Sequence, residues 1–348
     1  MKSLFFIAFL FALLAITLTE VNGCDHHGHH KKYGHRKLFV FGDSYADTGN
    51  MGKIGERHSR PWYEPYGMSY PHRPAGRFSD GIIFTDYLAT YLRLRTPTPY
   101  KYRKLSTKHP YGMNFAVGGS GVFYTPNDQR KLSAQIDAFQ AQINENVFSH
   151  HDVKSSVVYV AISGNDYSFY ANNHSLFDVY AYCRNVTTEL TVQLKRLAEI
   201  GVGKVLVANI SPLECTPTVT RSKSNYTKCD LGYSLGTSEH NILLSRFVGN
   251  LTQEIKSTQF LLVDLYNAFK SVIDTAHNGT RKFEHIMRPC CEPTTDDFDC
   301  GWVDNNGQKL YSLCSNPQDY FFFDTVHPTQ AGWGAVFENL VPWLKKNL

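Results

Sequence analysis

The stretch KLFVFGDSYADTGN, residues 37–50, passes from an apolar run into Gly42, Asp43 and Ser44 and then turns polar. The apolar run 37–41 has the length and composition of a buried β-strand. A serine on a tight turn between a strand and a helix projects its hydroxyl beyond the sheet, which suits a nucleophile. Serine and aspartate are also preferred helix caps, so Ser44 without partners is better explained as a cap. The rest of the chain decides between these interpretations.

Beyond residue 37 the chain alternates short β-rich runs with longer helical patterns, which is typical of a parallel sheet covered by helices. The predicted strands are KLFVF (37–41), NFAV (114–117), SVVYVAI (156–162), KVLVANI (204–210) and QFLLVDL (259–265). Apolar residues recur three to four positions apart over 82–91, 132–143 and 333–344, which predicts helices packed on that sheet. No linker-like segment divides residues 37–348, so we expect one α/β domain.

The N-terminus has the pattern of a signal peptide. One lysine precedes an apolar run from Leu4 to Leu18, and Val21 and Gly23 stand at the small-residue spacing of a cleavage site. The run is shorter than the ~20 residues that span a membrane, so we favour a cleaved signal peptide over 1–23 rather than a signal anchor. We therefore expect a protein outside the cell or in the vacuole, without a stable membrane span.

A histidine-rich segment, residues 24–36, follows the predicted cleavage site and holds five of the fifteen histidines. We interpret it as a flexible entry segment, with a metal-binding tract as the alternative. The formal net charge of the chain is +4 without a dense basic stripe, which argues against a nucleic-acid partner.

Eight cysteines behind a signal peptide are typical of disulfides formed in an oxidising compartment. They are Cys24, Cys183, Cys215, Cys229, Cys290, Cys291, Cys300 and Cys314. If all eight pair, the sequence alone leaves their connectivity open. The segment 281–320 carries four of them and no periodic pattern, so we expect disulfides to hold it. No Cys-x-x-Cys pair is present, so we expect no zinc site.

Six Asn-x-Ser/Thr sequons occur along the chain. We predict glycans at five of them, Asn173, Asn185, Asn225, Asn250 and Asn278. The sixth, Asn209, ends the apolar run 204–210. Because that run is predicted to be a buried strand, we exclude Asn209 as a glycosylation site.

Three polar clusters each follow a predicted strand. Residues 42–44 follow the first strand, residues 118–121 (GGSG) follow the second and residues 163–166 (SGND) follow the third. Ligands bind at the carboxyl ends of the strands in an open parallel sheet, so we expect the three clusters to meet there.

A nucleophilic serine needs a base and a carboxylate that orients the base. Only two histidines follow an aspartate by three residues, His277 after Asp274 and His327 after Asp324. The first pair runs into a sequon and should lie on the surface. The second pair lies between an aromatic run and the C-terminal helix, where packing would hold it rigidly. We therefore predict that Ser44, His327 and Asp324 act together.

An oxyanion in such a site must be held by hydrogen-bond donors. Gly118 or Gly119 can offer a backbone N–H, and Asn165 offers an amide that does not ionise. Ser120 and Ser163 are the competing serines. Ser120 misses the nucleophile-elbow pattern by its final glycine, and Ser163 has no evident base, so neither displaces Ser44.

Five segments together resemble the GDSL esterase/lipase family of secreted hydrolases, within the wider SGNH superfamily, and especially its plant branch. These segments are FGDSYADTGN, GRFSDGIIFTDYLA, GMNFAVGGSGV, VAISGNDY and DTVHPTQAGW. They stand in family order and span nearly the whole chain after the predicted signal peptide. The resemblance implies a three-layer α/β/α sandwich of flavodoxin-like type, with a mainly parallel sheet for which the pattern above predicts five strands.

The resemblance also implies a role for each matching residue. Ser44 would be the nucleophile, His327 the base and Asp324 the carboxylate that orients it. The oxyanion hole would consist of the backbone N–H groups of Ser44 and Gly119 and the side chain of Asn165.

The predicted function is a secreted serine esterase that hydrolyses small-molecule or lipid esters through an acyl-enzyme, without a metal or organic cofactor. An acyltransferase with an alcohol acceptor and a catalytically idle binding protein are the alternatives. Tyr45 departs from the family because the name motif has leucine there, which leaves the shape of the substrate site open. We expect a pocket lined by Tyr45, Phe115, Phe123, Tyr124 and Tyr167.

Overall fold

The computed structural model describes most of the chain after residue 36. It describes residues 37–348 without 54, 56–58, 105–107, 126–128, 163, 174–177 and 278–282, and without the side chains of 171–173, 276 and 277. The predicted signal peptide (1–23) and the histidine-rich segment (24–36) therefore lie outside the described residues.

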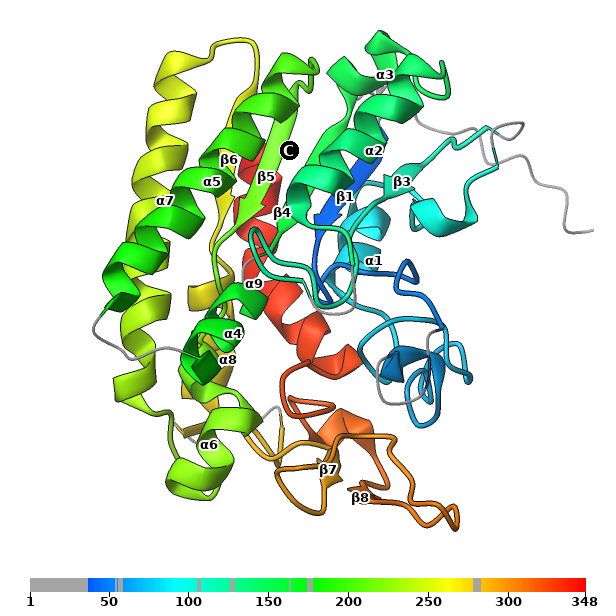
Figure 1. Ribbon diagram of the computed structural model, residues 1–348, viewed down its shortest axis with the longest axis vertical. Coiled ribbons are helices and arrows are strands. Elements are labelled where there is room, and N and C mark those ends of the chain that lie inside the picture. Colours follow the sequence, from blue (N-terminus) through cyan, green and yellow to red (C-terminus); the bar gives the residue numbers. More distant parts are fainter. Residues whose placement is uncertain are drawn as a thin grey trace, which may run out of the picture. The chain divides into compact units, whose positions relative to one another are not determined.

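A parallel sheet lies at the centre of the described residues (Figure 1). Its six strands are β1 (Leu38–Gly42), β2 (Thr98–Pro99), β3 (Gly112–Asn114), β4 (Val157–Ala161), β5 (Lys204–Ala208) and β6 (Gln259–Val263). Their order is β2-β3-β1-β4-β5-β6, and every neighbouring pair runs parallel. Without β2 this is the strand order of a flavodoxin-like sheet, so the predicted fold class is confirmed.

The prediction of five strands is wrong by one. The additional strand, β2, contains only Thr98 and Pro99, which is too short for any periodicity, and it lies at the edge of the sheet, where proline is tolerated. The predicted strand 114–117 is also shifted, because β3 ends at Asn114. Phe115 and Val117 still donate backbone hydrogen bonds to β1, at 2.7 and 3.0 Å, but they lie beyond the regular ladder.

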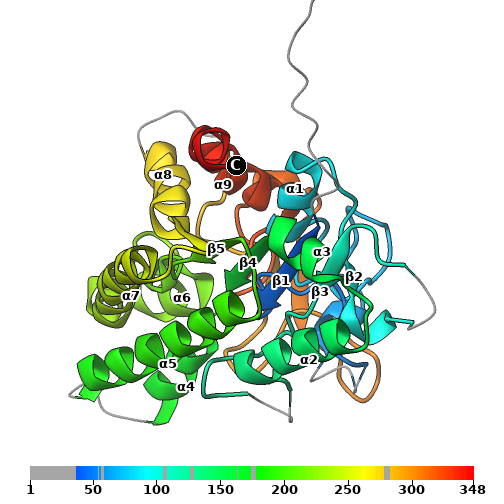
Figure 2. The ribbon, with the colours of Figure 1, turned by 90° about the horizontal axis from the view of Figure 1, so that it is seen from above.

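Helices cover both faces of the sheet (Figures 1 and 2). One face packs against α2 (Leu132–Asn144), α5 (Val179–Glu199) and α7 (Ser234–Glu254). The other packs against α1 (Phe84–Tyr91), α8 (Leu265–His277) and α9 (Gln330–Asn347). The shorter helices are α3 (His150–Ser155), α4 (Gly164–Asn173), α6 (Pro217–Ser224) and the 3₁₀ turns η1 (Arg60–Trp62), η2 (Tyr100–Tyr102), η5 (Leu213–Cys215), η6 (Leu231–Tyr233) and η7 (Pro317–Asp319).

Alternation along β1 explains how one short strand serves both layers. Leu38 and Val40 join the core beneath α1 and α9, whereas Phe39 and Phe41 join the core beneath α2. All four side chains are completely buried. Each such side chain contributes ~2 kcal/mol through burial, so the strand that carries the Gly-Asp-Ser turn is firmly anchored.

Gly42 ends β1 at a point where only glycine fits. Its φ is +145°, and a Cβ placed there would lie 1.9 Å from the carbonyl oxygen of Ala161 on β4. The N–H and carbonyl of Gly42 each pair with the side-chain amide of Gln135, both at 2.9 Å. The start of the following turn is therefore fixed from both sides.

Three disulfides are present among the described residues: Cys215–Cys229, Cys290–Cys314 and Cys291–Cys300. The last two brace the predicted irregular segment, which also contains the antiparallel pair β7 (Cys291–Pro293) and β8 (Tyr311–Leu313). Disulfides therefore hold this segment as predicted. Cys183 is buried and forms no disulfide with a described residue, whereas Cys24 lies outside the described residues.

The described sequons differ in exposure: the asparagines on or after helices are exposed, and the one that follows a strand is buried. Asn185 on α5, Asn225 after α6 and Asn250 on α7 are exposed. Asn209 is buried, and its side chain bonds with Asp264 and with the backbone of Tyr266. Asn278 and the side chain of Asn173 lie outside the described residues. Within the part of the chain that is described, no helix has the length and apolar character needed to cross a membrane.

Candidate active site

Ser44 lies in a turn at the carboxyl end of β1. The turn is closed by hydrogen bonds from the backbone N–H groups of Ala46 and Asp47 to the carbonyl of Asp43, at 3.1 and 2.9 Å. Residues 43–53 contain no helix, so the expectation of a strand-to-helix turn is wrong. The helix-cap interpretation of Ser44 is wrong for the same reason, since there is no helix for it to cap.

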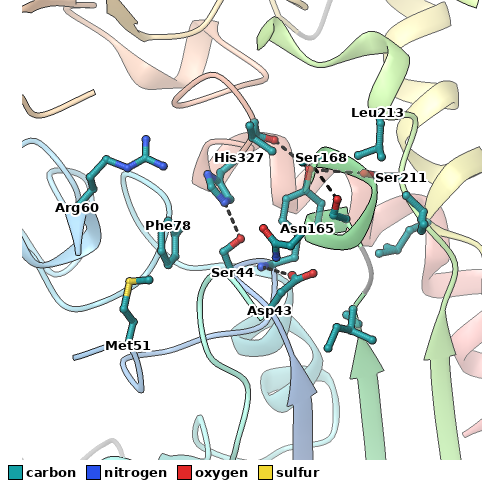
Figure 3. Close-up of a pocket in the computed structure, with 18 of the residues that line it drawn as sticks. Asp43, Ser44, Met51, Arg60, Phe78, Asn165, Ser168, Ser211, Leu213 and His327 are labelled. Atoms are coloured by element: carbon teal, nitrogen blue, oxygen red, sulfur yellow. Dashed lines mark hydrogen bonds between the residues drawn. The ribbon is translucent and has the colours of Figure 1, made fainter. Parts of the chain in front are cut away.

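The hydroxyl of Ser44 contacts the ring of His327 (Figure 3). The distance from Ser44 Oγ to His327 Nε2 is 2.8 Å, and Nδ1 of the same ring lies 2.9 and 2.8 Å from the two carboxylate oxygens of Asp324. Ser44 and His327 are 283 positions apart in the sequence. The three side chains that the sequence analysis grouped together therefore form one continuous hydrogen-bonded chain.

Asp324 is held as an anion in a buried position. Its exposed fraction is 1%, and its carboxylate accepts backbone hydrogen bonds from Val326 (2.9 Å) and His327 (2.7 Å) and a hydroxyl hydrogen bond from Tyr66 (2.7 Å). Burial alone would raise the pKa of this carboxyl. The charge and hydrogen bonds of His327 and the charge of Arg60 outweigh burial and hold the pKa well below its usual range.

Two aromatic rings confine the imidazole of His327. The centroid of the Phe78 ring lies 4.8 Å from that of the imidazole, with the two planes at 32°. The centroid of the Tyr45 ring lies 5.7 Å away, with the planes at 64°. The hydroxyl of Tyr45 donates to the carbonyl of Val326 at 2.9 Å. Tyr45 thus links the serine turn directly to the loop that carries the histidine, a contact that a leucine at this position cannot make.

The motif around Ser44 builds its own support. Asp47 accepts backbone hydrogen bonds from Gly49, Asn50 and Met51 at 2.6 to 3.0 Å, and a fourth, at 2.9 Å, from the N–H of Gly118. The serine turn (residues 42–51) and the glycine doublet (Gly118 and Gly119) are therefore joined through one buried carboxylate.

The glycine that faces the cavity is Gly119. It lines the cavity with φ +83°, a conformation that favours glycine, whereas the N–H of Gly118 points to Asp47.

Asn165 brings a second donor to the cavity from the start of α4. Its amide nitrogen donates to the carbonyl of Ser120 at 2.9 Å, which fixes the orientation of the amide. An amide nitrogen carries two hydrogens, so the same group can also donate into the cavity. The neighbouring Asp166 accepts backbone hydrogen bonds from Val122, Phe123 and Tyr124, at 2.7, 2.9 and 2.9 Å, and ties α4 to that loop.

A cavity of about 300 Å³ opens beside Ser44 and His327 (Figure 3). On one side lie Met51, Phe78 and Arg60, and Arg60 pairs with Asp299 at 2.9 Å. Ser211 and Leu213 lie on the other side in Figure 3, and the lining also includes Ile162, Ile210 and Leu265. Among the described residues there is no cluster of three or more His, Cys, Asp or Glu side chains suited to a metal.

Four of the five predicted pocket residues lie elsewhere. Tyr45 lines the cavity, but Phe115 is buried in the core and stacks on Phe41 at 5.2 Å. Phe123 and Tyr124 line a separate groove. Tyr167 is buried, and its hydroxyl pairs with Nδ1 of His240 at 2.7 Å. These residues are neighbours of the motifs in sequence, but their side chains do not line the cavity.

The competing residues are engaged elsewhere or fall outside the description. Ser120 is completely buried, and its hydroxyl donates to the carbonyl of Arg130 at 2.7 Å. Asp274 is exposed and pairs with Lys270 at 2.8 Å. Ser163 and the side chain of His277 lie outside the described residues.

Tyr66, Arg60 and Asp299 surround the site and were not anticipated from the sequence. None belongs to a recognisable motif, and Tyr66 reaches Asp324 across 258 positions. Only the three-dimensional arrangement brings them to the site, so no pattern in the sequence could have indicated them.

Comparison with known proteins agrees with this geometry. Residues 38–340 match the model of the family described as GDSL-like Lipase/Acylhydrolase. Two GDSL esterase/lipases of Arabidopsis thaliana are 39% and 37% identical, and each match covers 97% of this chain and 95% and 96% of the relative. Acetylajmalan esterase 2 of Rauvolfia serpentina is 27% identical, with 89% of this chain and 91% of that protein covered.

Proposed function

The chain belongs to the GDSL-like lipase/acylhydrolase family and is a carboxylic ester hydrolase, and we propose that it works through an acyl-enzyme on Ser44. The observation that carries this proposal is the chain of contacts from Ser44 Oγ through the His327 ring to both oxygens of Asp324, with each distance at 2.8 or 2.9 Å. A serine, an imidazole and a buried carboxylate in this order provide a nucleophile, a base and an orienting anion.

In the first half-reaction Ser44 Oγ attacks the carbonyl carbon of the ester while His327 Nε2 takes its proton. The bond between the carbonyl carbon and the alcohol oxygen then breaks, and His327 returns the proton to the departing alcohol. Asp324 keeps Nδ1 protonated, so that Nε2 is the atom that accepts the proton, and it stabilises the transient imidazolium. The product of this half-reaction is the free alcohol and an ester on Ser44.

The negative charge of the tetrahedral intermediate falls on the former carbonyl oxygen. We assign its stabilisation to the backbone N–H groups of Ser44 and Gly119 and to the Asn165 amide. Gly119 and Asn165 both line the cavity, and Asn165 is oriented in advance by Ser120. Donors fixed before the reaction need no reorganisation as the charge forms.

In the second half-reaction a water molecule attacks the carbonyl carbon of the acyl-enzyme and gives a proton to His327. The bond between that carbon and Ser44 Oγ then breaks, His327 returns the proton to Ser44 Oγ, and the carboxylic acid is released. If an alcohol took the place of water, the same steps would transfer the acyl group to it. Hydrolysis is the favoured outcome because both the family and its named relatives are ester hydrolases.

The cavity favours small esters. Its volume of about 300 Å³ lies at the lower end of the ~300–1,000 Å³ range of small-molecule sites. We propose a short acyl group or a small alcohol as the part enclosed, with the remainder of the substrate outside.

We also propose that the protein is secreted and carries N-linked glycans. Three disulfides among the described residues support passage through an oxidising compartment. The predicted signal peptide and the exposed sequons point the same way.

The proposal is tested by hydrolysis of p-nitrophenyl acetate, butyrate and palmitate by the purified full chain. We expect the acetate and butyrate esters to be cleaved faster than the palmitate ester. Ser44→Ala should abolish the activity, whereas Ser168→Ala, a serine that lines the same cavity, should retain most of it. Full activity of Ser44→Ala would contradict the assignment of the nucleophile, and equal rates on all three esters would contradict the inferred size limit.

A further inference from the structure

A second hollow lies apart from the cavity at Ser44, between the loop after the glycine doublet and helices α4 and α5, which lie near each other in Figure 2. We call it the aromatic groove and define it by Phe123, Tyr124, Phe169 and Tyr182. Its volume is about 650 Å³. The rings of Tyr124 and Phe169 stack face to face, with their centroids 4.1 Å apart and their planes at 17°, so they form one rigid aromatic pair.

The aromatic groove exposes more apolar surface than scattered surface residues would. Phe123 and Phe169 retain 41% and 37% of their surface exposed. Contiguous exposed aromatic surface usually marks a place where something binds. The lining from α5 combines Tyr182 with the polar residues Asn185, Thr188 and Glu189. Aromatic rings together with hydroxyl, amide and carboxylate groups fit a sugar ring, whose C–H face is apolar and whose edge carries hydroxyls.

One lining residue supplies the sugar. Asn185 is exposed and begins the sequon Asn185-Val186-Thr187. We propose that the aromatic groove holds the innermost sugars of an N-linked glycan on Asn185. This proposal rests on the proposed secretion, because only a chain in the secretory pathway receives such a glycan.

The position of Asn185 distinguishes it from the other exposed sequons of the described residues. Asn225 and Asn250 line neither the cavity at Ser44 nor the aromatic groove. A glycan on Asn185 is attached at the lining of the groove. Its first sugars are therefore already near the rings, and little conformational entropy is lost when they bind there.

The loop that lines the groove is tied to α4. The backbone N–H groups of Phe123 and Tyr124, which form part of the groove, donate to Asp166 at 2.9 Å each. Asp166 follows Asn165, whose side chain lines the cavity at Ser44. Sugars packed on this loop should therefore steady residues 122–124.

The first test compares Asn185→Gln with the matched variant Asn250→Gln, both made as the full chain in a plant secretory host. Peptide mass spectrometry should find Asn185 occupied in the wild type. We expect Asn185→Gln to lower the Tm by about 2 °C or more and to speed amide hydrogen exchange over residues 122–124. Asn250→Gln should change neither quantity, and both variants should keep their hydrolysis of p-nitrophenyl acetate.

The second test combines Asn185→Gln with Phe169→Ala, which removes one exposed ring of the groove. If the glycan packs on this ring, the Tm loss caused by Asn185→Gln should shrink by at least half in the Phe169→Ala background. Equal losses in both backgrounds would overturn the proposal, as would an unglycosylated Asn185 beside an occupied Asn250. If no sequon is occupied, the proposed secretion itself fails. A wild type that hydrolyses no ester would instead contradict the catalytic proposal. The Tm and hydrogen-exchange results would still decide the glycan proposal.

Discussion

The serine turn, residues 42–51, and the histidine loop, residues 320–329, meet at two hydrogen bonds, Ser44 to His327 and Tyr45 to Val326, but are held in place by different means. The serine turn continues from a central strand. Gly42 pairs with Gln135 on α2, and Asp47 accepts hydrogen bonds from four backbone N–H groups, three in the turn and one at Gly118. Asn114 on the neighbouring strand donates to the carbonyl of Ala46 at 2.7 Å. Support for the turn therefore comes from hydrogen bonds to the strand and the helix that lie beside β1.

The histidine loop depends on residues distant in sequence. Tyr66 donates to the carboxylate of Asp324, and Tyr45 donates to the carbonyl of Val326. The backbone N–H of Cys291, which also forms a disulfide with Cys300, donates to the carbonyl of Phe323 at 2.7 Å. The histidine loop is therefore held by tyrosine hydroxyls and by a disulfide-bonded segment, whereas the serine turn is held by the sheet.

The difference indicates where variation affects the reaction. Changes near the serine turn should disturb the fold, because the turn shares its supports with the sheet. Changes behind the histidine loop should lower the rate while the fold survives, because single side chains orient the base. The following predictions test this comparison, beginning with the largest expected effect.

Ser44→Ala and His327→Ala should each lower kcat by about 10⁴-fold or more, because either change removes half of the proton-transfer pair. Since the two regions act as one unit, the double variant should be no slower than the worse single variant. Pre-steady-state and steady-state hydrolysis of p-nitrophenyl acetate would measure this. Effects that multiply in the double variant would show that the two residues act independently.

Asn165→Ala should lower kcat by about 10²-fold with little change in KM, because the amide acts on charge that develops only in the transition state. Ser168→Ala, one turn further along α4, is the matched control and should have a small effect. A change confined to KM would place Asn165 in ground-state binding and not in the oxyanion hole.

Tyr66→Phe should lower kcat by about 10-fold, because one hydrogen bond to the buried carboxylate of Asp324 is lost and the base becomes less well oriented. KM and the Tm should change little. Tyr100→Phe, another buried tyrosine on a different side of the sheet, is the control. An unchanged kcat would mean that the backbone contacts of Asp324 suffice to hold the base.

Tyr45 separates the two regions most directly, because it belongs to one and contacts the other. Tyr45→Phe removes the hydrogen bond to Val326 but keeps the ring, and should lower kcat by about 5-fold. Tyr45→Leu, which restores the leucine of the family motif, should lower kcat at least as much and also enlarge the cavity. A relative gain on p-nitrophenyl butyrate over the acetate would report that enlargement, and equal losses on both esters would argue against it.

Stability at low pH should reflect the carboxylate of the histidine loop. The pKa of Asp324 is lowered in the folded protein by His327 and Arg60 acting against burial, so its stabilising effect is complete above the ordinary aspartate pKa of about 4. That effect is lost as the pH falls from about 4 toward the lowered value. Denaturant unfolding between pH 5 and pH 2, in roughly half-unit steps, should show a smaller loss for Asp324→Asn than for the wild type. Parallel curves would contradict this.

The sequence was sufficient for the features that repeat along it. The strands β1, β4, β5 and β6 are apolar runs of five residues, long enough to be recognised, and polar clusters at their ends brought Ser44 and Asn165 to the same edge. The strand β2 has two residues and no pattern.

The supports of the histidine loop were beyond prediction for a related reason. The hydroxyl of Tyr66 bonds across 258 positions, and nothing near Tyr66 in the sequence distinguishes it from other tyrosines. The predicted pocket was wrong for the opposite reason. Phe115 lies beside a motif in sequence, but its side chain packs in the core against Phe41. Closeness in sequence was informative along strands and misleading for side-chain direction.

The most direct test of the account is to label the full chain with a fluorophosphonate, digest it, and identify the modified peptide by mass spectrometry. The account predicts one adduct, on Ser44, that is lost in Ser44→Ala and formed far more slowly in His327→Ala. An adduct on a different serine, or the same labelling rate with and without His327, would contradict the claim that the serine turn and the histidine loop form one catalytic unit.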